Sequence, residues 1–113
     1  MKPNKNTHWA VRNINGTSKN KCSCKSWLTH WKIGANKWGY VSCAVHGCSR
    51  PAEVGAHVLI TDNRSNWQWW IAPFCKGHNH KSNIDEMYLK VGMDLISANA
   101  QITCQRGDWW ETL

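Results

Sequence analysis

The chain has 113 residues and a formal net charge of +7, from 14 lysines and arginines against 7 aspartates and glutamates. This length is typical of one small domain, so we expect a single domain over 1–113. No run of 18 apolar residues occurs, which argues against a membrane span, and the polar N-terminus lacks the apolar region of a secretory signal. These features predict a cytoplasmic protein with reduced thiols.

In chain order, residues 1–25 are rich in Lys, Asn, Ser and Thr, and this segment is expected to be loop-like. Ser26 is a candidate N-cap for a short helix that begins at Trp27 and stops at Gly34. Trp27 and Trp31 fall on one face of that helix. The chain has nine tryptophans; each is expected in the core more often than on the surface, where it would stack bases.

Residues 53–61 alternate between two faces, with Gly55, His57 and Leu59 on one of them, which predicts a strand. One face carries four apolar side chains, and His57 lies on the other face, toward a groove or solvent. Turn residues at 62–65 lead to a second strand over 66–74, ended by Pro73, so the two strands are expected to form a hairpin. The segment that starts at Cys75 is expected to turn into a short helix. Residues 84–99 fit short strands, with a helix over 84–91 as the alternative.

Two cysteine and histidine pairs flank this hairpin. Cys43 and Cys48 have four residues between them, and Cys75 and His78 have two. Pairs with such spacing supply two ligands from one tight turn, and four Cys or His ligands are typical of structural zinc. His46 is the alternative to Cys48. The competing interpretation makes the cysteines core residues and His78 a surface residue.

The remaining cysteines are less informative. Cys22, Cys24 and His30 would form a weak second cluster, although free or buried thiols are favoured, and Cys104 is isolated. The even number of cysteines leaves a disulfide framework open. The positive charge favours an anionic partner, usually nucleic acid, with plain solubility as the alternative.

The stretches CSRPAEVGAHV (48–58) and WWIAPFCKGHNHKSN (69–83) resemble the HNH, or ββα-metal, endonuclease superfamily. The resemblance implies an α+β fold with a small treble-clef core over 43–83, made of a zinc knuckle, a β-hairpin and a short helix. An N-terminal helical extension and a C-terminal strand or helix would complete the fold. Such small proteins are often of bacterial or phage origin.

The resemblance also implies roles for individual residues. A structural zinc would be held by Cys43, Cys48, Cys75 and His78, with His78 in place of the usual fourth cysteine. His57 would be the general base, and Asn79 or His80 would bind a catalytic divalent metal. The family usually has an acidic residue just before the base, but this chain has Ala56 there. Loss of that carboxylate weakens a Mg²⁺ site, whereas the remaining donors would still suit Zn²⁺, Ni²⁺ or Mn²⁺.

We therefore expect a small basic zinc protein that binds nucleic acid, DNA in preference, with a degenerate catalytic site. The expected phosphate contacts flank the hairpin and the segment after it, and are Arg50, Arg64, Lys76 and Lys81. One alternative is an active metal-dependent endonuclease that uses His57. Another is a zinc-stabilised module that binds a protein partner through exposed tryptophans.

Overall fold

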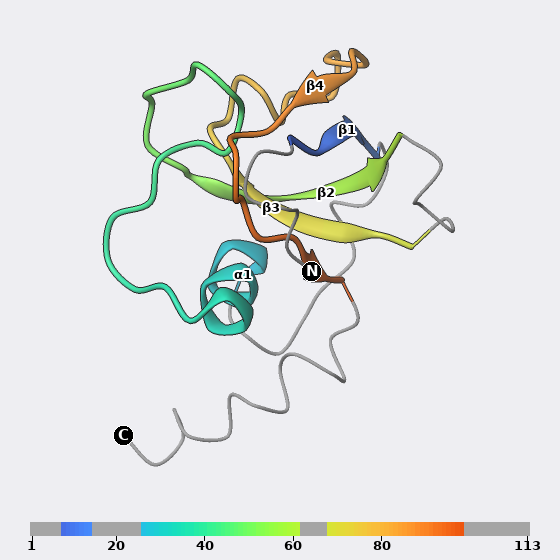
Figure 1. The fold of residues 1–113 in the computed structure, drawn as a ribbon. Helices are drawn as coiled ribbons and strands as arrows, with labels where there is room; N and C mark the ends of the chain where they lie inside the picture. Colours follow the sequence, from blue (N-terminus) through green and yellow to red (C-terminus); the bar gives the residue numbers. More distant parts are fainter. Residues whose placement is uncertain (1–7, 15–25, 62–67, 99–113) are drawn as a thin grey trace.

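The computed structural model describes residues 8–14, 26–61 and 68–98. This part of the chain forms a five-stranded antiparallel sheet and one helix, which confirms the expected α+β class (Figure 1). The strand order is β4-β1-β2-β3-β5. The elements are β1 (Ala10–Asn13), α1 (Trp27–Ala35), β2 (Val54–Ile60), β3 (Trp70–Phe74), β4 (Met87–Tyr88) and β5 (Ile96–Ser97).

The predicted hairpin is present as β2 and β3, with His57 opposite Ile71. The alternation of β2 also holds, since Ala56, Val58 and Ile60 are all buried in the core. Side chains in or next to β1, β3 and β4, and in the loop before β2, complete this core, including Trp9, Val11, Ala44, Val45, Phe74, Met87 and Leu89. The metal-ligand candidates Cys43 and Cys75 belong to the same cluster, so the candidate site is built onto the edge of the main core.

Helix α1 begins as the sequence predicts. The Ser26 side chain accepts a 3.0 Å hydrogen bond from the backbone N–H of Thr29, which is N-cap geometry. The helix continues through Gly34 and ends at Ala35, because Asn36 takes the left-handed conformation (φ 54°) and its N–H caps the last turn. The stop expected at Gly34 is therefore wrong. The helix packs on β2, β3 and β5.

The first correction concerns the segment expected to be loop-like. Within residues 1–25 the chain forms β1, which pairs with both β2 and β4. Trp9 and Val11 are buried while Arg12 is exposed. This short alternation is the strand signal, but the polar residues around it outweigh it in a composition-based reading. Pairing on both sides supplies the hydrogen bonds that a strand of this length needs.

The second correction concerns the short helix expected after Cys75. Residues 76–79 form a turn instead. The backbone N–H of Asn79 bonds to the carbonyl of Cys75 at 3.2 Å, as in one turn of helix. The next N–H, that of His80, bonds to the carbonyl of Gly77 at 3.3 Å instead of that of Lys76. The His78 carbonyl accepts side-chain hydrogen bonds from Asn13 and Asn83. The helical ladder therefore stops after a single turn.

The segment 84–99 forms the short strands β4 and β5 rather than the alternative helix over 84–91, with residue 99 outside the described part. Of the tryptophans, Trp9 and Trp31 are buried, whereas Trp38 and Trp69 are exposed. In the described ranges, no helix is long and apolar enough to cross a membrane.

Candidate metal centre

The first two candidate ligands lie on the loop between α1 and β2. A tight turn brings them together: the backbone N–H of Cys48 bonds to the carbonyl of Val45 at 3.0 Å, and Gly47 adopts a φ of 82°. Such positive φ values suit glycine. The N–H of Ala44 also bonds to the carbonyl of Pro73 at 2.7 Å. This knuckle is therefore anchored to the end of β3, where the other two ligands begin.

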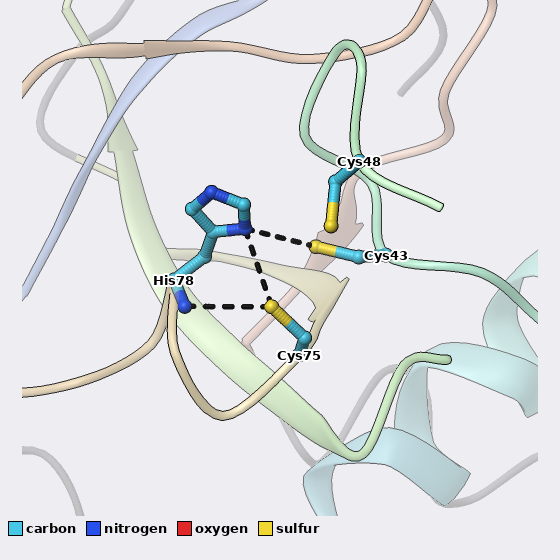
Figure 2. A group of neighbouring side chains, drawn as sticks. All are labelled: Cys43, Cys48, Cys75 and His78. Atoms are coloured by element: carbon cyan, nitrogen blue, oxygen red, sulfur yellow. Dashed lines mark hydrogen bonds between the residues drawn. The ribbon is translucent and has the colours of Figure 1, made fainter. Parts of the chain in front are cut away.

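The second pair follows β3 directly. Nδ1 of His78 lies 3.2 Å from Sγ of Cys75 and 3.5 Å from Sγ of Cys43 (Figure 2). The donor atoms of Cys43, Cys48, Cys75 and His78 all lie within 4.8 Å of one another. The structure thus brings together the four ligands that the sequence predicts, from two segments that the hairpin separates.

This donor set fits a tetrahedral metal. Zinc binds thiolate sulfur at about 2.3 Å, so the sulfurs of a tetrahedral site lie about 3.8 Å apart, close to the spread of this group. Three sulfurs and one imidazole nitrogen are typical structural-zinc ligands. Cys48, not His46, joins the group. His46 is exposed, and its ring contacts that of His8 with centroids 4.9 Å apart. The four residues are therefore able to hold a metal such as zinc.

The thiols of this group differ in acidity. Burial raises the pKa of Cys43 to about 11. Burial also opposes ionisation of Cys48, but hydrogen bonds with the Arg50 backbone and with the other two thiols outweigh it and lower the pKa of Cys48. Cys48 is half-buried, whereas Cys43 and Cys75 are buried. Metal binding requires deprotonated thiols, so loading should release protons and depend on pH.

Two asparagines support the fourth ligand. The side-chain amide nitrogens of Asn13 and Asn83 donate to the His78 carbonyl at 2.7 and 2.9 Å. The Asn13 nitrogen also approaches the Asn83 carbonyl at 3.4 Å. We call these hydrogen bonds of Asn13 and Asn83 the clamp, and they link β1 to the turn that carries His78. Sequence reasoning missed Asn13, because its partner is 65 residues away and nothing local indicates the contact.

The structure places His57 on β2, beneath α1. Its side chain is 6% exposed and packs edge-on against Trp27 of α1, with ring centroids 4.5 Å apart. The expectation that His57 faces a groove or solvent is wrong, because α1 covers that face of β2. Burial, with a smaller contribution from His30, lowers the pKa of His57 to about 4.

The other predicted site residues lie around the metal group. Asn79 is half-buried, and His80 is exposed with Nδ1 2.7 Å from Oγ of Ser82. His57 lies under α1 and these two lie on the turn after Cys75, so the catalytic role of the set stays a prediction. The expected phosphate contacts Arg50, Lys76 and Lys81 are exposed. Arg64, Cys22, Cys24 and Cys104 lie outside the described residues.

In comparisons with known proteins, no protein-family model, no curated protein and no solved structure matches this chain.

Proposed function

We propose that this chain is a zinc-stabilised, HNH-like module of treble-clef type that binds nucleic acid through the basic loops around its metal centre. The observation that carries the proposal is the exposure of cationic side chains on both ligand-bearing segments. Arg50 lies two residues after Cys48, Lys76 follows Cys75, and Lys81 lies on the turn after His78, all exposed.

The physical reason is electrostatic. Cations that approach phosphates release condensed counterions, which drives binding largely independently of sequence. A metal centre fixes the two loops relative to each other, so their charges are held in one arrangement before binding. Lys76 and Arg50 also belong to a chain of net charge +7, which favours encounter with a polyanion.

The test is the affinity of the zinc-loaded protein for a labelled DNA duplex and for the corresponding single strand over a range of salt concentrations. The triple variant Arg50→Ala, Lys76→Ala, Lys81→Ala should bind more weakly. The slope of its log affinity against log salt concentration should become shallower, by an amount that corresponds to the loss of up to about three phosphate contacts. The matched control is Lys37→Ala, at an exposed position beyond the end of α1. Equal binding by the triple variant and the control would contradict the proposal.

The burial of His57 under α1 favours binding without cleavage, because a general base must reach the attacking water. Incubation of plasmid DNA with the zinc-loaded protein and Mg²⁺, Mn²⁺ or Ni²⁺ should leave the DNA intact. Cleavage that disappears in His57→Gln would instead establish the endonuclease alternative.

A further inference from the structure

Helix α1 covers only part of one sheet face, and we call the remainder, over β1 and β4, the outer face. The helix packs on β2, β3 and β5, which leaves the outer side of β1 and β4 without helix contacts in the described part of the chain. In this region Val11 is paired with Met87, and both are buried in the core. Because neighbouring residues of a strand point to opposite faces, Arg12 and Tyr88 turn outward.

The metal-binding knuckle continues this outer face. Val45 forms a β-bridge with Leu89, and both are buried. The backbone N–H of His46 bonds to the carbonyl of Tyr88 at 2.9 Å, so these two residues are neighbours across the bridge. The His8 ring contacts the His46 ring edge-on at 4.9 Å. We call His8, His46 and Tyr88 the ring patch.

The ring patch combines exposed aromatic surface with positive charge. Tyr88 is 58% exposed, and His46 and Arg12 are also exposed. Arg50 lies four residues after His46 along the knuckle and is also exposed. Two exposed carboxylates, those of Asp85 and Glu86, precede Tyr88 in the chain, and Glu86 accepts a hydrogen bond from the hydroxyl of Thr61. An exposed ring beside a guanidinium, here that of Arg12, is an arrangement that stacks a base while a neighbouring phosphate is neutralised.

We propose that Tyr88 is a stacking platform for an unpaired base, and that the nucleic acid bound by this protein is therefore single-stranded. The inference rests on the proposed function. A duplex keeps its bases stacked on one another, so it offers phosphates to Arg50 but no base face to Tyr88. Single strands expose both, and recognition by stacking tolerates any base.

The experiment compares a short labelled oligothymidylate with the same sequence annealed to its complement, by fluorescence anisotropy with zinc-loaded protein. The single strand should bind more tightly than the duplex. Tyr88→Ala should weaken single-strand binding by about tenfold, whereas Tyr88→Phe should retain it because the ring is kept. Tyr40→Ala is the matched control, since Tyr40 is 74% exposed on the loop after α1.

The outcomes separate the two proposals. Loss of single-strand binding in Tyr88→Ala but not in Tyr88→Phe or Tyr40→Ala supports the stacking role. If Tyr88→Ala binds like the wild type while the basic triple variant binds weakly, the stacking role is overturned and the proposed function survives. If neither strand form binds the wild type, both proposals fail and a protein partner becomes the better interpretation of the patch.

Discussion

The side-chain amide of Asn13 donates a 2.7 Å hydrogen bond to the carbonyl of His78. The first strand of the sheet thereby holds the turn that carries the fourth candidate metal ligand. A metal site depends on such outer contacts, because they orient the ligands before the metal arrives. The pair therefore links the sheet and the metal centre.

Replacing Asn13 with alanine tests this link. The variant loses the hydrogen bond to the His78 carbonyl, so the free energy of unfolding should fall by about 1 kcal/mol. Zinc should also dissociate faster, as measured by transfer to a coloured chelator. Arg12→Ala, at the neighbouring exposed position, is the control and should release zinc at the wild-type rate. Equal rates in all three proteins would show that the clamp does not support the ligand.

The ligand set predicts a specific metal stoichiometry. Protein purified without chelator should contain about one zinc per chain by elemental analysis, and Cys48→Ser and Cys75→Ser should lose it. His46→Ala should keep it, because His46 lies outside the group of four. Removing zinc with a strong chelator should unfold much of the structure, since metal binding energy contributes to folding. A folded wild type without metal would contradict the assignment.

Helix α1 lies so close to the sheet at Gly55 that this position has no room for a side chain. A β-carbon added at Gly55 would lie 2.3 Å from the backbone carbonyl carbon of Trp27, so Gly55→Ala must displace α1. We expect a loss of about 3 kcal/mol in urea unfolding. Gly77→Ala is the matched control, because its β-carbon would meet only Sγ of Cys75, at 4.0 Å. Similar stabilities for the two variants would mean that α1 shifts without cost.

The buried histidines under α1 predict a dependence of stability on pH. The pKa of His57 is about 4 in the folded protein and about 6.5 when unfolded. The unfolded chain therefore binds the proton more tightly. The stability that neutral His57 contributes is complete above about pH 6.5 and is lost as the pH falls toward 4, by at most about 3 kcal/mol. Burial lowers the pKa of His30 as well, which adds to the loss.

The measurement is urea unfolding of zinc-loaded protein at pH 7 and pH 5, with bound zinc followed in the same samples. His57→Leu should reduce the stability difference between the two pH values, while His80→Ala, at an exposed site, should leave it unchanged. An unchanged difference in His57→Leu would assign the acid sensitivity to other groups, His30 or the metal ligands.

The hairpin, the start of α1 and the four ligands could be predicted because their signals are local. Ser26 caps its own helix, and the Cys75–His78 spacing fits a single turn. The environment of His57 could not be predicted in this way. Strand alternation correctly places His57 on the other face of the sheet from Val58. Whether that face is covered depends on where α1 packs. The position of α1 in turn depends on distant contacts such as the hydrogen bond from Trp31 Nε1 to the Asp94 carbonyl at 3.0 Å.

The helix predicted after Cys75 was wrong for a related reason. Its helical hydrogen bonds stop after a single turn, and the His78 carbonyl bonds to the side chains of Asn13 and Asn83 rather than to the N–H of Ser82. Asn13 is remote in sequence. Strand β1 could not be predicted for the same reason, since a four-residue strand is stable only when it pairs with both β2 and β4. Tertiary contacts therefore decide these elements, and local propensity does not.

The place of β1 between β2 and β4 (Figure 1) has a consequence for synthesis on the ribosome. Strand β1 emerges before both of its partners, which follow about 45 and 75 residues later. Trp9 and Val11 therefore stay unburied until β4 is made, by which time the β2–β3 hairpin and the candidate metal ligands around it have been synthesised. The hairpin can therefore form early, and the closing of the sheet comes last. A nascent chain arrested before residue 87 would expose the unpaired edge of β1, where aggregation would begin.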